Sequence, residues 1–262
     1  MDKKITFFFF VFLCTYGCSK FDKLLKSDNN ELKYRKALEY YDNKEYVKAG
    51  TLFESLVPIY RATDKIDSIS YYQAMCTYKQ GDYILAAYYF KNITTLYTAS
   101  IFVEEAEFMT GYCYYIASPR PSLDQQNTYS AIEAFQIYLR KYPDSDRVVE
   151  VKKYIVELKD KLVEKSYKNA KLYYDLQEYK ASIIALNNSL QDFPDTKYRE
   201  DILFLILKSH FLLAERSVQT KKNERYQATI DAYYSFYDEY KHSKYIGEAE
   251  RIYKETKRKL EN

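Results

Sequence analysis

The feature that most constrains this chain is an internal repeat of about 37 residues. A motif of aromatic, small and aromatic residues occurs twice in regular form, as Tyr46-x-x-Ala49-x-x-x-Phe53 and Tyr83-x-x-Ala86-x-x-x-Phe90. Looser copies begin at Tyr129, Tyr179 and Tyr226. Spacings of three and four residues place side chains on one face of a helix. Because a single helical pair cannot bury its apolar face alone, such units stack on their neighbours. The repeat therefore predicts an all-α chain of stacked helical pairs.

Another small residue lies twelve positions before the alanine of each regular motif. Ala37 lies twelve residues before Ala49, and Ala74 lies twelve before Ala86. Two helices that cross closely need a small side chain at the contact. The pattern resembles tetratricopeptide repeats and implies a solenoid of about five helix-turn-helix units with a C-terminal capping helix. We expect helical pairs at residues 31–61, 66–100, 103–142, 146–194 and 197–241, and the capping helix at 244–260.

Prolines and hydroxyl residues predict where these helices end and begin. Pro143 and Pro194 each end a helix, because proline cannot continue the helical hydrogen-bond pattern. Ser145 and Thr196 follow them and are predicted N-caps of the next helices. The third unit carries eight extra residues in the segment 118–127, which its prolines identify as a loop between helices.

The amino terminus has the pattern of a secretory signal. Lys3 and Lys4 precede an apolar run of nine residues, 5–13, which is far shorter than the ~20 residues of a membrane-spanning helix. Gly17 and Cys18 follow, and together with the short apolar run they resemble a bacterial lipobox. That resemblance implies cleavage before Cys18 and acylation of its sulfur.

Two alternatives to acylation at Cys18 stay open. Thr15 and Tyr16 depart from the residues usual in a lipobox, so the segment could be an ordinary cleaved signal with Cys18 incidental. Cys14 is a weaker candidate for the acylated residue. Ser19 follows Cys18 without an acidic run, and by resemblance to lipoproteins this implies the outer membrane, with the protein facing the periplasm.

These patterns divide the chain into four parts. Residues 1–17 are predicted to be a lipoprotein signal peptide and 18–30 a polar, lipidated tether. Residues 31–143 would form the N-terminal repeats, units one to three. Residues 144–262 would form the C-terminal repeats, units four and five, and the capping helix.

The chemistry of an enzyme is missing from the sequence. No nucleophile, phosphate-loop or zinc motif occurs, and the two histidines, His210 and His242, lie 32 residues apart. We therefore expect no enzymatic activity, no cofactor and no metal site. A net charge of +3 on 262 residues gives no broad field for nucleic acid, so no nucleic-acid partner is expected.

Two residue types allow more than one interpretation. Cys76 and Cys113 lie 37 residues apart at equivalent positions of adjacent repeats. Stacked helices sit ~8–10 Å apart and a disulfide needs Cα atoms within ~7 Å, so both are predicted to be small buried residues.

The 32 tyrosines include six adjacent pairs, in which one ring should pack and the other lean outward. They could simply fill the repeat core, or the outward rings could line a groove for an extended peptide.

The loop and helix of the third unit carry a family resemblance. The segment Ser118-Pro-Arg-Pro-Ser-Leu-Asp-Gln-Gln-Asn-Thr-Tyr-Ser-Ala-Ile-Glu-Ala-Phe135 is followed by Tyr142-Pro-Asp-Ser145. With the lipobox and the order of repeats, this pattern resembles the BamD family, the lipoproteins of the outer-membrane β-barrel assembly machinery. The stretch 160–174, followed by 193–196, adds to the likeness. Arg120 and Asp124 belong to this pattern and are candidate partner-binding residues.

The resemblance implies a scaffold that assists insertion of outer-membrane proteins. Its C-terminal repeats would bind the periplasmic domains of a BamA-like barrel-forming subunit, its N-terminal repeats would contact unfolded outer-membrane proteins, and accessory lipoproteins would bind as well. Lys208 and His210 interrupt an apolar run in the helix 199–215 and are the candidate partner-facing residues there.

Other classes of protein remain as alternatives. A different tetratricopeptide-repeat envelope lipoprotein would share the repeats, but such proteins usually begin with a coiled coil, which residues 19–34 do not predict. A glycan-binding lipoprotein would favour tryptophan, and this chain has none.

Overall fold

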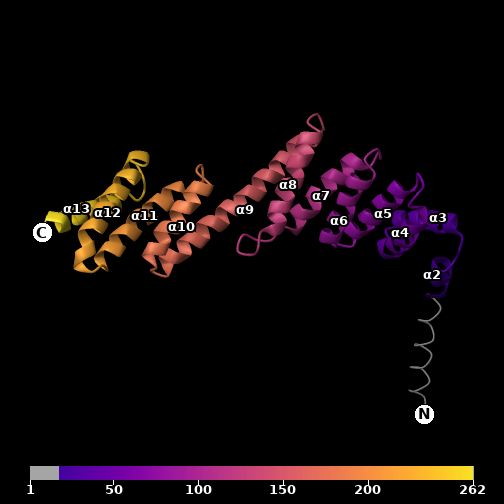
Figure 1. Cartoon of the computed structure of the whole chain (residues 1–262), viewed down its shortest axis with the longest axis horizontal. Coiled ribbons are helices and arrows are strands. Elements are labelled where there is room, and N and C mark those ends of the chain that lie inside the picture. The colour runs from indigo at the N-terminus through magenta and orange to yellow at the C-terminus, as the bar shows by residue number, and fades with distance from the viewer. Residues whose placement is uncertain (1–17, 262) are drawn as a thin grey trace, which may run out of the picture. The chain divides into compact units, whose positions relative to one another are not determined.

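The structure is a computed structural model that describes residues 18–261. All regular structure in that range is helical (Figure 1). In chain order the helices are α2 (Cys18–Leu25), α3 (Asn30–Asp42), α4 (Tyr46–Tyr60), α5 (Ile66–Lys79), α6 (Tyr83–Leu96), α7 (Val103–Ala117), α8 (Gln126–Lys141), α9 (Val148–Asp175), α10 (Tyr179–Asp192), α11 (Arg199–Glu215), α12 (Gln219–Glu239) and α13 (Ile246–Glu261).

Ten of these helices form five consecutive hairpins, α3–α4, α5–α6, α7–α8, α9–α10 and α11–α12. Within each unit, consecutive hairpins pack through the second helix of the first hairpin, as α4 does on α5, α6 on α7 and α10 on α11. The last helix, α13, covers α12 and α11. The predicted fold class, an all-α tetratricopeptide-repeat solenoid of about five units with a capping helix, is confirmed.

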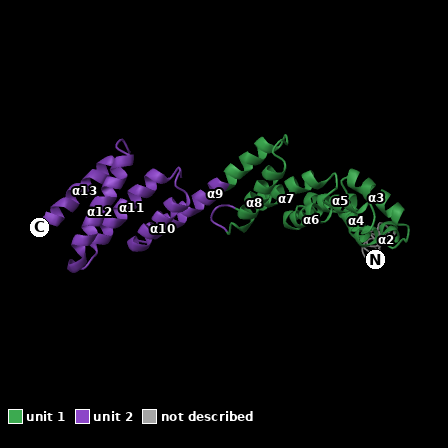
Figure 2. Ribbon diagram, turned by 45° about the horizontal axis from the view of Figure 1, so that its top comes forward, with its two compact units in different colours: residues 1–119, 124–158 green, residues 120–123, 159–262 purple. Residues whose placement is uncertain are grey.

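The described chain divides into two compact units (Figure 2). Unit 1 comprises residues 18–119 and 124–158, and unit 2 comprises 120–123 and 159–261. The boundary thus lies inside α9, whereas the sequence placed it at residue 143. The first turns of α9 belong to unit 1 because Val151, Ile155 and Leu158 are buried in its core beside Phe135.

Small residues lie where helices touch, as the repeat spacing requires. Ala37, Ala74 and Ala86 are fully buried. Gly111 takes the corresponding position in the third hairpin, and a Cβ built there would meet the Phe135 ring at 2.5 Å. The absence of a side chain at residue 111 therefore allows α7 and α8 to approach closely.

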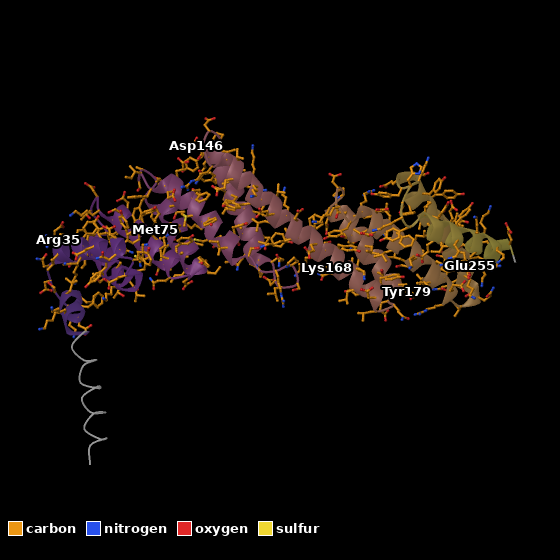
Figure 3. The ribbon with its side chains drawn as sticks, turned by 180° about the vertical axis from the view of Figure 1, so that it is seen from behind. Arg35, Met75, Asp146, Lys168, Tyr179 and Glu255 are labelled. Atoms are coloured by element: carbon orange, nitrogen blue, oxygen red, sulfur yellow. The ribbon has the colours of Figure 1, made fainter. Side chains whose placement is uncertain are left out.

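The connections between hairpins share one hydroxyl turn. Ser145 Oγ accepts a hydrogen bond from the Arg147 amide, and Thr196 Oγ1 accepts one from the Tyr198 amide. The turn that contains Ser145 and Asp146 joins α8 to α9 (Figure 3). The prediction that Ser145 and Thr196 are N-caps is wrong in position, because α9 and α11 begin three residues later. The hydroxyls order the turn that leads into each helix.

The same turns carry side chains that cover the preceding repeat. In unit 1, Phe102 stacks on Tyr71 with ring centroids 4.4 Å apart. In unit 2, Tyr245 stacks on Phe204 at 4.2 Å. Phe102 directly precedes α7 and Tyr245 directly precedes α13, so an aromatic contact links each of these helices to the preceding hairpin. Aromatic pairs of this kind add ~0.5–1.5 kcal/mol beyond burial of their area.

The amino-terminal segment differs from the polar tether that the sequence predicts. Residues 18–25 form α2, whose Phe21, Leu24 and Leu25 pack against the core of the first hairpin. Phe21 meets Tyr40 of α3 edge to face, with ring centroids 5.9 Å apart. The three apolar residues follow helical spacing, and their burial outweighs the polar composition of the segment. The predicted signal peptide, residues 1–17, lies outside the described residues.

Both cysteines of the repeats behave as the spacing predicts. Cys76 and Cys113 are free and fully buried, and burial raises the pKa of each thiol to about 12.

Among residues 18–261 no helix is both long enough and apolar enough to cross a bilayer.

Candidate partner-binding surfaces

The structure contains a groove in unit 1, between α6 and α8 and over α7. Its volume is about 240 Å³, and the unit 1 groove is lined by Lys91, Thr94, Thr95, Glu107, Thr110, Tyr114, Ser130, Glu133, Ala134, Ile137 and Lys141. Pockets for small organic ligands usually measure ~300–1,000 Å³. A groove of this size fits one or two side chains of a protein partner better than a cofactor.

An ion pair forms one wall of the unit 1 groove. Glu107 on α7 is buried, and its carboxylate lies 2.7 Å from the ammonium of Lys141 on α8. Lys141 is about half exposed, so it neutralises Glu107 while remaining within reach of a partner. A buried charge is strongly unfavourable once its partner is lost. The pair therefore fixes the sign and position of charge in the groove.

Unit 2 contains a groove at the equivalent place, between α10 and α12 and over α11. The unit 2 groove measures about 280 Å³ and is lined by Asn187, Leu203, Ile206, His210, Ala228, Asp231, Ala232 and Ser235. Its α11 residues, Leu203, Ile206 and His210, have the same three- and four-residue spacing as Glu107, Thr110 and Tyr114 of α7. The same three helix positions thus hold Glu107, Thr110 and Tyr114 in α7, and two aliphatic residues and a histidine in α11.

The structure places the predicted site residue His210 in the wall of the unit 2 groove. The side chain is half-buried, and this burial lowers the pKa of His210, an effect that the carboxylate of Asp231 opposes. Because the pKa lies below its usual value, the imidazole is neutral at neutral pH. His210 therefore offers a neutral hydrogen-bonding group between the apolar Ile206 and the acidic Asp231.

Lys208, the second predicted residue of α11, has partners within the chain. Its ammonium lies 3.0 Å from Glu248 of α13, and also over the rings of Phe204 and Tyr174 at 5.4 Å and 5.7 Å. Burial lowers the pKa of Lys208, but hydrogen bonds to Glu248 and Tyr174 outweigh burial and leave the pKa above its usual value. Lys208 thus ties the capping helix to α11 and does not lie in the unit 2 groove with His210.

Arg120 and Asp124 lie in the exposed loop between α7 and α8. The carbonyl of Arg120 accepts a hydrogen bond from the Leu123 amide, which forms a turn. Asp124 Oδ1 accepts one from the Gln126 amide at 2.9 Å and so orders the turn that leads into α8. Asp124 belongs to unit 1, whereas Arg120 belongs to unit 2 with Lys208 and His210.

Of the groove residues, only His210 could be identified from the sequence. A repeated spacing could have found the ion pair, because Glu107 and Lys141 lie 34 residues apart, as do Glu31 and Lys65, which pair at 2.7 Å. The other lining residues are ordinary helix-surface types, and only the packing of three helices brings them together. Within residues 18–261 no cluster of histidine, cysteine or carboxylate side chains could hold a metal ion.

The chain is similar to two kinds of known protein. A solved structure described as the TPR2AB-domain:pHSP90 complex of yeast Sti1 is similar to this chain at 12% sequence identity and a TM-score of 0.40, covering 87% of this chain and 98% of that one. The family model of the outer membrane lipoprotein YfiO matches residues 26–226, a range that includes the unit 1 groove and most of unit 2. This match spans more than half of the chain. The chain therefore belongs to the YfiO family of outer membrane lipoproteins.

Proposed function

We propose that this protein is a scaffold of the outer-membrane β-barrel assembly machine. It is anchored by a lipid on Cys18, faces the periplasm, and assists insertion of outer-membrane proteins by holding partner proteins. In this proposal residues 1–17 are a signal peptide that is removed before acylation.

The observation that carries the proposal is the family match over residues 26–226 on a fold made of stacked helical hairpins. Such repeats present long surfaces on which an extended segment or a folded partner can lie. The two grooves, each of a size for single side chains, support a role in protein recognition rather than in chemistry. Ser235 and His210 both line the unit 2 groove, but the Ser235 hydroxyl donates its hydrogen bond to the backbone carbonyl of Asp231 and not to His210.

The two grooves suggest a division of partners. The unit 2 groove, with Leu203 and Ile206 in its wall and His210 beside them, is suited to an apolar side chain from a folded domain. We assign it to the periplasmic domains of a BamA-like barrel-forming subunit. The unit 1 groove presents two lysines, two glutamates and Tyr114, and we assign it to segments of unfolded outer-membrane proteins.

The loop that contains Arg120 and Asp124 is the third proposed contact. Both side chains are exposed, and the loop carries the sequence pattern that resembles the BamD family. We assign this loop to the accessory lipoproteins of the machine. Lys208 is kept as a residue that supports the partner face, because it fixes the capping helix beside α11.

Site-specific photo-crosslinking in living cells tests the assignment of the grooves. A photoreactive amino acid replaces exposed groove residues, Asn187 in unit 2 and Lys91 in unit 1. Position 187 should crosslink to one barrel protein with repeated periplasmic domains. Position 91 should crosslink to several outer-membrane proteins, and only while they are being synthesised.

The control is the same photoreactive residue at Lys152, an exposed position of α9 outside both grooves. Crosslinks at position 187 that match those at position 152 would contradict a specific groove. Crosslinks only to peptidoglycan-associated proteins would favour the alternative, a different repeat lipoprotein of the envelope.

A further inference from the structure

A row of lysines runs along the exposed side of α2 and into the turn after it, where the Lys26 amide still donates to the Asp22 carbonyl. Lys20, Lys23 and Lys26 are all exposed and follow one another at intervals of three residues. A helix turns ~100° per residue, so these three side chains span one face of about 120°. The opposite face carries Phe21, Leu24 and Leu25, which pack against the core of the first hairpin.

Docking leaves only the charged face of α2 available to a partner. Because its apolar side is already covered by the first hairpin, α2 has no free apolar stripe to insert into a bilayer. Asp22 lies at the edge of the lysine face and lowers its net charge. The surrounding segment, residues 18–36, still holds six basic and three acidic side chains, a net charge of +3 that equals the net charge of the entire chain.

The three lysines lie close to Cys18, the proposed site of the lipid anchor. The helix begins at Cys18, and Lys26 follows eight residues later. At a rise of ~1.5 Å per residue, all three lysines lie within ~12 Å of the anchor along the helix axis. The Debye length is ~10 Å at 0.1 M salt, so charges this close to a membrane surface still act on it.

We infer that the lysine face of α2 binds anionic phospholipid headgroups and so fixes the first hairpin against the membrane. This inference rests on the proposed acylation of Cys18, which brings α2 to the surface. A docked helix also leaves little free chain between the anchor and the first repeat. The lipid and the three lysines then act as two attachments that together set the orientation of unit 1.

The test uses a chain that begins at residue 18 and carries Cys18→Ser, so that no acyl chain contributes. Its binding is measured by co-sedimentation with vesicles of phosphatidylcholine alone and of phosphatidylcholine mixed with phosphatidylglycerol. The triple variant Lys20→Gln, Lys23→Gln and Lys26→Gln removes the three positive charges of this face. The matched control removes three exposed lysines of α9, in the variant Lys152→Gln, Lys153→Gln and Lys159→Gln.

Each lysine near an anionic surface contributes about fivefold to partitioning, so the triple variant should bind the mixed vesicles on the order of a hundredfold more weakly. The α9 control should bind as the parent does, and vesicles of phosphatidylcholine alone should bind neither. Equal loss in both variants, or equal binding of the parent to both kinds of vesicle, would overturn the inference.

A failure of this inference can be told apart from a failure of the proposed function. Acylation of Cys18 is read separately from the mass of the amino-terminal peptide of the membrane-extracted protein. An acylated chain whose lysine variant binds unchanged contradicts only the role of α2. A chain without acylation contradicts the anchor, whatever the vesicles show.

Discussion

Replacing Gly111 by alanine should destabilise the protein, although alanine is the better helix former. A Cβ at position 111 would lie 2.5 Å from Cδ1 and 2.6 Å from Cε1 of Phe135, whereas carbon atoms prefer ~3.5–4.0 Å. The Phe135 ring is fully buried, and its centroid lies 5.6 Å from the stacked ring of Tyr154. The ring therefore has no space to move into, and α7 and α8 would have to separate.

The magnitude follows from a matched control in the same chain. Gly247 also lies in a helix, and a Cβ there meets nothing within 4 Å. Gly247→Ala should stabilise the protein by up to ~1 kcal/mol through helix propensity alone. Gly111→Ala gains the same propensity but adds ~1–3 kcal/mol of overpacking. The free energies of unfolding of the two variants should therefore differ by about 1–3 kcal/mol.

Urea unfolding measures this difference directly when it is followed by circular dichroism at 222 nm, where the signal reports helix content. The slope of the unfolding free energy against urea should be the same in both variants, because both retain the fold. Equal stability of Gly111→Ala and Gly247→Ala would refute the close contact between α7 and α8.

Three further predictions concern titratable and reactive side chains. The ion pair of Lys208 and Glu248 is tested by a double-mutant cycle of Lys208→Met and Glu248→Gln. The coupling energy from urea unfolding should be roughly 1 kcal/mol. Additive effects of the two substitutions would contradict an ion pair between α11 and α13. Burial lowers the pKa of His210, so the unfolded protein binds a proton at this residue more readily than the folded protein does. The free energy of unfolding should therefore fall as the pH is lowered from about 7.5 to about 5.5. His210→Gln should flatten this pH dependence, and an unchanged dependence would contradict the burial of His210. Cys76 and Cys113 should react with a thiol reagent only in denaturant, whereas fast labelling of the folded protein would contradict their burial and raised pKa.

The hairpins could be predicted because small and aromatic residues recur at fixed spacings along the chain. Ala37 and Ala74 mark positions where only a small side chain fits, and such a position constrains two helices at once. The same reasoning identified Cys76 and Cys113 as buried and unpaired. Local repetition is enough for this level of structure, since each hairpin contacts mainly its neighbours.

The amino-terminal helix could not be predicted from its composition. Phe21, Leu24 and Leu25 are three apolar residues within a polar segment, and they form a helix face only because the first hairpin offers an apolar surface to cover. The unit boundary inside α9 was missed for a related reason. Nothing in the sequence interrupts the helix, and which residues pack into unit 1 depends on the position of Phe135.

The candidate site was the least predictable part. His210 could be identified as a polar residue in an apolar run, but its groove is completed by Asn187 and Asp231 from two other helices. Lys208, two residues away, was grouped with it by sequence. The structure instead gives Lys208 a partner in Glu248 of α13.

If this protein is a scaffold of the β-barrel assembly machine, as we propose, the proteins that it binds in the membrane should include the other parts of that machine. The acylated, tagged protein is purified from gently solubilised membranes, and the co-purified proteins are identified and quantified by mass spectrometry. A barrel protein with repeated periplasmic domains should be recovered in near-equal amount. Recovery of only peptidoglycan-associated or transport proteins would contradict it.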